Sequence, residues 1–229
     1  MIASGRLVRL PPFERGLTLG DFLVPVRIGE RLSSPARHAV LIVLGALLIV
    51  VGARISFYLP DDPVVPVTLQ TFGVLFGGAL LGFRRGLASI GLYLLLGFAG
   101  LPVFAYDAAD HVYRSGIGTV ASFQGGGLSL GPTGGYLIGF LLAAAVVGRL
   151  AELGWDRNVV GSIAALVLGE VAIYAVGLPW LAASAHLGLA DTLKFGLTPF
   201  LLGDLLKLAV AAGLLPVGWW AVRRRPSDR

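Results

Sequence analysis

Residues 199–222 read PFLLGDLLKLAVAAGLLPVGWWAV, an apolar run long enough to cross a membrane as a helix. Only Asp204 and Lys207 interrupt it with charge. Each ionisable side chain costs roughly 2.5 to 3.5 kcal/mol at membrane depth, so such residues usually face a cavity and belong to a functional site. Their i, i+3 spacing places both on one helical face. The run predicts a membrane helix that carries a polar site, and a pair that only neutralises itself is the alternative.

The start of this helix can also be predicted. Thr198 is a good N-cap, and Pro199 suits the first helical position. At about 1.5 Å per residue, Asp204 and Lys207 would lie roughly 8 to 12 Å inside the helix. We therefore expect the pair in one leaflet of the bilayer.

The composition of the whole chain excludes a water-soluble domain. Of 229 residues, 56% are hydrophobic and 14% are charged, and the mean hydropathy is +0.83. These values indicate a multi-pass membrane protein. The absence of Cys excludes disulfides and thiol nucleophiles, and residues 1–35 lack the continuous apolar core of a secretory signal. Although the pI is near 10, no basic face or aromatic and basic motif indicates nucleic-acid binding.

Apolar runs separated by Gly, Pro or charge predict an all-α membrane protein with six transmembrane helices. No period-2 alternation supports a barrel, so the backbone must be satisfied within helices. A cytoplasmic arm (1–35), a transmembrane domain (36–222) and a basic tail (223–229) make up the chain. The predicted spans are 38–58, 68–82, 86–104, 132–150, 159–178 and 199–222.

Lys and Arg residues divide unequally between the two sides of these spans. Five lie in the arm 1–35 and a sixth, Arg37, follows it, while two lie in the turn 83–85, two in the turn 149–158 and four in the tail. The opposite side has only Arg54, Arg114 and Lys194. Cytoplasmic loops carry the excess of Lys and Arg, so both termini should be cytoplasmic. Asp204 and Lys207 then belong to the outer leaflet.

An outer pocket follows from the lengths of the spans. The second span has about 15 apolar residues, or about 22 Å of helix against a hydrocarbon core near 30 Å. Residues 60–66 before it are Pro-rich and should be extended, and the third span breaks up at Gly97, Gly100 and Pro102. Non-helical backbone at membrane depth is tolerated only where protein buries it or a polar cavity accepts it.

Two segments place polar or small residues at this outer side. Residues 66–71 carry Thr68 and Gln70, which can donate and accept hydrogen bonds, although Thr68 could instead cap a helix. Residues 131–136 open the fourth span. Their glycines allow a close backbone approach, and a helix N-terminus offers free N–H groups, although dense helix packing is the alternative. The candidates in this second segment are Thr133, Gly134, Gly135 and Tyr136.

Glu170 is a third ionisable residue inside a span, with Tyr174 four residues later on the same face. It could line the pocket, pair with Lys207 or Arg54, or remain protonated in the core. These alternatives stay open.

Small residues also recur along the first span, at Ala39, Ala46 and Ala53. Such a stripe lets another helix approach closely, either from this chain or from a partner.

Four motifs in order resemble the BioY family of biotin transporters, which are substrate-binding (S) components of energy-coupling-factor (ECF) transporters. The resemblance covers residues 38–222 and leaves residues 1–35 outside it. It implies six helices, an outward pocket for biotin bound by Asp204 and Lys207, a membrane-embedded T component and cytoplasmic ATPases. The motifs are PVTLQTF (66–72), YLLLG with GLPVF (93–97 and 100–104), GPTGGYLIG (131–139) and GDLLK (203–207).

The chemistry of biotin suits these residues. Asp204 can accept hydrogen bonds from the ureido N–H groups, and Lys207 can donate to the ureido carbonyl or to the carboxylate. Tyr93, Phe104, Tyr136 and Trp180 can pack on the ring and the chain of the vitamin. We expect a plasma-membrane protein that needs no cofactor or metal and docks its partner through Ala46 and Ala53.

Two alternatives to biotin binding are compatible with the sequence. One is an S component for another small vitamin. The other is an intramembrane enzyme that uses Asp204, Glu170 or His111 as acid or base, although no nucleophile cluster or metal motif supports it.

Overall fold

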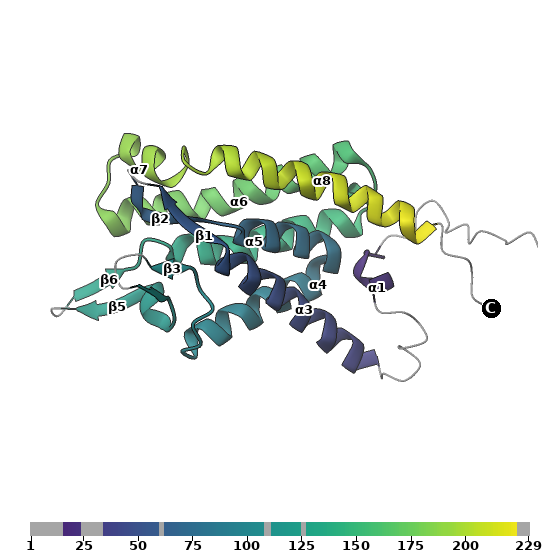
Figure 1. Ribbon diagram of the computed structural model, residues 1–229, viewed down its shortest axis with the longest axis horizontal. Coiled ribbons are helices and arrows are strands. Elements are labelled where there is room, and N and C mark those ends of the chain that lie inside the picture. The colour runs from purple at the N-terminus through teal and green to yellow at the C-terminus, as the bar shows by residue number, and fades with distance from the viewer. Residues whose placement is uncertain (1–15, 24–33, 60–61, 108–110, 125–126, 224–229) are drawn as a thin grey trace, which may run out of the picture.

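The computed structural model describes residues 16–23, 34–59, 62–107, 111–124 and 127–223. Five helices in these ranges are long and apolar enough to cross a membrane, and they lie side by side along the long axis of the molecule (Figure 1). The protein is therefore mostly helical. The five helices are α3 (Ser34–Arg54), α4 (Gln70–Phe98), α5 (Gly134–Glu152), α6 (Val159–Ala185) and α8 (Leu201–Arg223).

Helix α4 is broken at Gly82, whose φ of 80° and ψ of −178° are not helical. The chain reverses its direction there. A contact between residues on either side of the break shows this: the Gln70 Nε2 atom donates to the Tyr93 hydroxyl at 2.5 Å. A straight helix would separate these two residues by about 34 Å. Gly78 and Gly86 also meet, since a Cβ added at Gly86 would lie 3.3 Å from the Gly78 Cα atom. The predicted spans 68–82 and 86–104 overlap the two halves of α4, which ends at Phe98 rather than at residue 104.

The helices pack in a continuous series. Helix α4 contacts both α3 and α5, α5 contacts α6, and α8 packs on α6 and α4. Glycine and alanine allow the close approaches: a Cβ at Gly73 would lie 3.1 Å from the backbone of Ile49. The side chains of Ala143, Ala144 and Val147 on α5 are fully buried. This packing fixes the positions of the helix ends that surround the site.

The predicted docking role of Ala46 and Ala53 is wrong. Their exposed fractions are 2% and 0%, because α4 of the same chain covers this side of α3. The neighbouring glycines fit the same contact, since a Cβ at Gly52 would collide with the backbone of Leu69. Small residues predicted a close helix neighbour correctly, but the neighbour is internal.

Short strands and a short helix gather at one end of the molecule (Figure 1). The all-α expectation is therefore wrong in this detail, because three antiparallel two-stranded hairpins join the helices. The extended backbone predicted for residues 60–66 is present as the second strand, whereas residues 60–61 lie outside the described residues. The elements are β1 (Ser56–Leu59), β2 (Asp62–Thr68), β3 (Tyr106–Asp107), β4 (Val112–Tyr113), β5 (Ala121–Gln124), β6 (Gly127–Leu130), the 3₁₀ helix η1 (Ile117–Thr119) and α7 (Leu189–Gly196).

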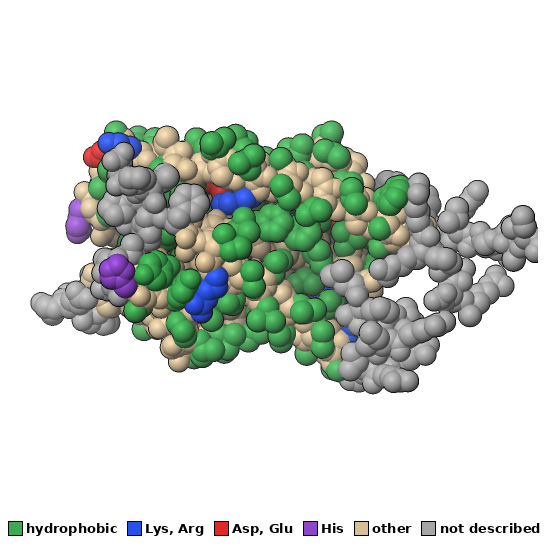
Figure 2. Space-filling view, in the orientation of Figure 1, with side chains coloured by type: hydrophobic (Ala, Val, Ile, Leu, Met, Phe, Trp, Pro, Cys, Tyr) green, Lys and Arg blue, Asp and Glu red, His purple; other side chains and the backbone are tan. Residues whose placement is uncertain are grey.

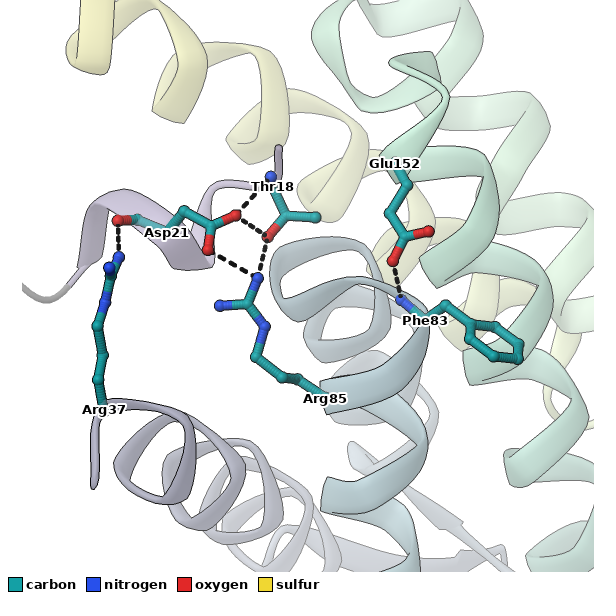
Figure 3. Close-up of polar contacts among 6 residues, drawn as sticks. All are labelled: Thr18, Asp21, Arg37, Phe83, Arg85 and Glu152. Atoms are coloured by element: carbon teal, nitrogen blue, oxygen red, sulfur yellow. Dashed lines mark hydrogen bonds and ion pairs between the residues drawn. The ribbon is translucent and has the colours of Figure 1, made fainter. Parts of the chain in front are cut away.

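At the opposite end, residues 16–23, which include α1 (Gly20–Leu23), dock onto the helix ends (Figure 3). Thr18 is only 1% exposed, and the Asp21 carboxylate pairs with Arg85 at 2.8 Å. Glu152 of α5 accepts the backbone N–H of Phe83 at 2.9 Å, directly after the break in α4. This part of the arm is thus a packed element, while residues 1–15 and 24–33 of the predicted cytoplasmic arm lie outside the described residues.

Candidate ligand-binding site

A pocket lies at the end of the molecule that carries the three β-hairpins, between α4, α5, α6 and α8. It encloses about 690 Å³ of empty space, its open mouth included. Residues 105–131, which we call the strap, contribute part of the wall. The lining consists of Pro66, Thr68, Gln70, Thr71, Phe104, Ala105, Tyr106, Arg114, Thr119, Thr133, Tyr136, Leu137, Phe140, Glu170, Ile173, Tyr174, Phe200, Asp204 and Lys207.

Asp204 lies in the first turn of α8, because that helix begins at Leu201. The predicted N-cap at Thr198 is wrong: the Thr198 hydroxyl donates to the Leu193 carbonyl at 3.0 Å and so closes the end of α7. The predicted depth of 8 to 12 Å is therefore too large for Asp204. A carboxylate in the first turn of a helix is stabilised by the helix dipole.

A hydrogen-bonded network holds the Asp204 carboxylate. Its Oδ2 atom accepts from the Tyr174 hydroxyl at 2.5 Å, and its Oδ1 atom accepts from the Lys207 ammonium at 2.9 Å. Lys207 also donates to the Thr71 hydroxyl at 3.0 Å. Asp204 is 5% exposed, and the network joins α4, α6 and α8 across the pocket floor.

Glu170 lines the same pocket with 7% of its surface exposed. Within the described part of the chain, its Oε1 atom has no hydrogen-bond partner. Of the alternatives left open for Glu170, the structure supports the pocket-lining one over pairing with Arg54, because the Arg54 guanidinium donates to the Pro102 carbonyl at 2.5 Å and lies 3.8 Å from the centre of the Tyr113 ring.

Thr68 and Gln70 both line the pocket, and Tyr93 stands behind them. The Thr68 hydroxyl accepts the Gln70 backbone N–H at 3.2 Å, so it also satisfies a donor at the start of α4. Tyr93 has no exposed surface and is absent from the lining. Its hydroxyl fixes the Gln70 amide, so Tyr93 positions a lining residue without facing the pocket itself.

Trp180 also lies outside the pocket lining, as do Gly134 and Gly135, which pack against it. The Trp180 indole N–H donates to the Gly131 carbonyl at 2.9 Å, and a Cβ at Gly134 would lie 3.0 Å from the indole ring. Gly134 and Gly135 therefore provide close packing between α5 and α6. From the same segment, Thr133 and Tyr136 reach the pocket, and Tyr136 donates to the Gly196 carbonyl at 2.8 Å.

Several residues that line the pocket were not among the predicted binding residues. Two of them could have been found from the sequence. Thr71 lies three residues after the candidate Thr68, and Tyr174 lies four residues after the candidate Glu170. Arg114 was recognisable as the single Lys or Arg between residues 105 and 131. It pairs with Asp107 through a 2.6 Å hydrogen bond from Nε. Apolar lining residues such as Phe140 and Phe200 carry no such signal, because nothing distinguishes them from core residues.

No metal centre is present in the described ranges, where acidic and His side chains form no group of three or more. His111 lies on the strap, is exposed and contacts the Tyr106 hydroxyl at 3.3 Å, away from Asp204 and Glu170.

Taken together, the long apolar helices and the open pocket, whose largely apolar lining carries a few charged and polar side chains, define a multi-pass membrane protein with a site for a small ligand. The chain belongs to the BioY family, whose family model matches residues 27–224.

Named relatives and a solved structure agree with this assignment. The chain is 42% identical to the biotin transporter BioY of Thermotoga maritima over 166 residues, which are 72% of this chain and 85% of that protein. It is 34% identical to the biotin transporter BioY of Rhizobium etli over 174 residues, 73% of this chain and 84% of that protein. The crystal structure of the S-component for biotin from an ECF-type ABC transporter shares its fold, with a TM-score of 0.68 and 24% identity over 85% of this chain and 95% of that one.

Proposed function

We propose that this chain binds biotin and acts as the S component of an ECF-type transporter for biotin uptake. The observation that supports this most directly is the Asp204 and Lys207 pair in an enclosed pocket of a BioY-family chain. The relatives named above are biotin transporters. As a transporter component, the chain carries out no covalent chemistry.

The pocket offers a partner for each part of biotin. Asp204 can accept from the ureido N–H groups, and Gln70 and Thr133 add further hydrogen-bonding groups. Phe104 and Tyr136 supply apolar surface for the ring and the chain of the vitamin. Lys207 and Arg114 supply positive charge for the carboxylate. Four of the predicted binding residues do not contact the ligand in this proposal. They pack behind the lining residues and fix their positions: Tyr93, Gly134, Gly135 and Trp180.

The proposed topology has six membrane crossings, with both termini in the cytoplasm and the pocket open to the outside. Two antiparallel halves of α4 and four further long helices support six crossings. The described cations support the orientation. At the pocket end lie Arg54, Arg114 and Lys194, and at the opposite end lie Arg37, Arg84, Arg85, Arg149, Arg157 and Arg223. Residues 36–222 then form one transmembrane domain between the arm 1–35 and the tail 223–229.

Uptake in this proposal needs a membrane-embedded T component and cytoplasmic ATPases in the plasma membrane. The sequence carries no nucleotide-binding motif that could drive transport by itself. Binding and transport are therefore separable, and binding by the purified chain is the direct test.

The test is biotin affinity of the purified protein and of the variants Asp204→Asn and Lys207→Ala. Each variant should bind at least about tenfold more weakly, because each leaves a buried polar partner unsatisfied. Lys194→Ala is the matched control, since Lys194 is an exposed cation at the same end of the molecule. Competition with thiamine, riboflavin and desthiobiotin separates biotin from other vitamins. Absence of binding at micromolar biotin, or full affinity in both variants, would contradict the proposal.

A further inference from the structure

Two hydroxyl groups contact the Asp204 and Lys207 pair, one at each charge. The Lys207 ammonium donates to the Thr71 hydroxyl at 3.0 Å, and Thr71 lies in the first turn of α4. The Tyr174 hydroxyl, from the middle of α6, donates to the Asp204 Oδ2 atom at 2.5 Å. The pair itself is carried by α8, so its two partners reach it from two different helices. Both partners also line the pocket.

Lys207 needs such a partner because its charge sits at the end of a flexible chain of four carbon atoms. An ammonium has three N–H donors. In the described part of the chain, Lys207 gives one donor to Asp204 Oδ1 and one to Thr71 Oγ1. Asp204 lies on the same helix, so this contact alone leaves the ammonium free to move across the pocket. The bond to α4 adds a second fixed point, and the remaining donor then has a defined direction.

Tyr174 does the same for the carboxylate. Lys207 donates to Oδ1 of Asp204 and Tyr174 donates to Oδ2, so the carboxylate cannot turn about its terminal bond without losing a donor. The Tyr174 ring is itself held against the Tyr136 ring of α5, with the ring centres 6.3 Å apart and the planes at 85°. Because a carboxylate has about four acceptor positions, those that remain on Asp204 are fixed in direction as well.

We propose that Thr71 and Tyr174 are positioning residues, which hold the two charges of the pair in a fixed geometry before the ligand arrives. This inference rests on the proposed binding of biotin. The side chains of Lys207 and Asp204 are only 11% and 6% exposed, so the direction of each hydrogen bond matters more here than it would in water. Groups that are already ordered lose less entropy on binding. A site of this kind favours a ligand that presents N–H donors and an acceptor side by side, as a cyclic urea does.

The first experiment observes Lys207 directly, because the chain has only two lysines. Solid-state NMR of lysine-labelled protein in lipid vesicles measures the mobility of each lysine side chain, and the exposed Lys194 is the internal reference. Without ligand, Lys207 should be rigid in the wild-type protein and clearly more mobile in Thr71→Val, which keeps the shape of the side chain but lacks the hydroxyl. Thr71→Ser keeps the hydroxyl and should keep Lys207 rigid.

A mobile Lys207 in the wild-type protein, or a rigid one in Thr71→Val, would overturn the role of Thr71. The wild-type spectrum needs no variant, so it tests the inference even where a substitution weakens folding. Biotin affinity then measures the consequence for binding. Thr71→Val should bind about three- to tenfold more weakly than wild type, and Thr71→Ser within about twofold of it.

The role of Tyr174 is tested with two ligands, biotin and a biotin that is methylated on one ureido nitrogen and so lacks one donor. The wild-type protein should discriminate strongly between them. Tyr174→Phe keeps the ring but frees the carboxylate to turn, so it should lower the ratio of the two affinities at least about threefold. Tyr113→Phe is the matched control, because it removes a tyrosine hydroxyl outside the pocket lining and should keep the ratio.

Equal losses of affinity for both ligands in Tyr174→Phe would mean that Tyr174 only packs the wall, and an unchanged affinity for both would mean that its hydroxyl does not act on Asp204. Either result would overturn this inference alone. Absence of biotin binding by the wild-type protein would instead overturn the proposed function, whereas the spectra recorded without ligand would still decide whether Thr71 fixes Lys207.

Discussion

Asp156 is a buried carboxyl group that lies at the end of the molecule opposite the pocket. It belongs to the 3₁₀ helix η2 (Trp155–Arg157) and is 1% exposed. Burial raises the pKa of Asp156 to about 6, although the Trp219 indole N–H, which donates to it at 2.7 Å, and the charge of Arg157 act in the other direction. The folded protein therefore holds a proton there more tightly than the unfolded chain does.

This difference predicts a pH dependence of stability. The stabilisation from the Asp156 proton is complete below about pH 4 and is lost as the pH rises to about 6, because the folded-state pKa is the higher one. The loss should be up to about 3 kcal/mol. Asp156→Asn should abolish it, whereas Asp191→Asn, at an exposed carboxyl, should not. Thermal unfolding between pH 4 and pH 7 measures the effect, and parallel curves for wild type and Asp156→Asn would contradict it.

The two aspartates differ in how well the sequence revealed them. Asp204 was recognisable because it interrupts a long apolar run, where a carboxylate needs a reason. Asp156 stands in the polar turn LGWDRN, where a carboxylate is ordinarily exposed. Its burial depends on Trp219, which arrives from α8 more than sixty residues later. A contact of that kind has no local signal in the sequence.

At the scale of elements, the break in α4 depends on Gly82. Its backbone conformation is one that only glycine adopts readily. A Cβ at this position would also lie 2.9 Å from Thr18 Cγ2 and 3.0 Å from the Glu152 carboxylate, both part of the cluster in Figure 3. The turn, the docked residues 16–23 and the end of α5 therefore share one small space.

Gly82→Ala should consequently lower the free energy of unfolding by about 1 to 3 kcal/mol. Gly91→Ala is the matched control, because Gly91 lies within the second half of α4 and a Cβ there meets nothing within 4 Å. That control should leave stability unchanged or raise it by up to about 1 kcal/mol. Thermal unfolding of both variants in the same detergent compares them, and equal stability would show that the break does not need glycine.

The boundaries of the elements show where local signals fail. The span 159–178 was predicted to end before Pro179, yet α6 continues to Ala185. The residues beyond the proline pack tightly: Leu181 is fully buried and Trp180 covers the start of α5. Tertiary packing thus outweighs the local cost of a proline within a helix. At Thr198, a favourable local signal for a helix start is not used. The Thr198 hydroxyl instead hydrogen-bonds to the end of the preceding helix, α7.

At the scale of the whole molecule, the proposed topology can be tested because the chain has no Cys. Ser115 is exposed on the strap at the pocket end, and Arg84 is exposed beside the Gly82 turn at the other end. An impermeant maleimide should label Ser115→Cys in intact protoplasts and should label Arg84→Cys only after permeabilisation. The unsubstituted protein is the blank. Labelling in the opposite order would reverse the orientation.

The surface agrees with a membrane environment. Figure 2 shows hydrophobic side chains along the sides of the helices. Exposed apolar residues such as Val43, Leu47 and Val51 lie on the side of α3 away from α4. Hydropathy and the distribution of charge predicted these features from the sequence, because both are averages over many residues. The internal neighbour of Ala46 and the strap residue Arg114 in the pocket depend on single contacts, which such averages do not contain.

The Gly82 break also has a consequence for how the chain is made. Its two halves, 70–81 and 83–98, are about 18 and 24 Å long, and each is shorter than a hydrocarbon core of about 30 Å. Neither half alone is therefore a strong signal for membrane insertion. We expect the two halves to enter the bilayer as one unit during translation, with Arg84 and Arg85 kept on the cytoplasmic side. A force-sensitive arrest peptide moved along the nascent chain would then record one pulling event for α4, whereas two separate events would show independent insertion.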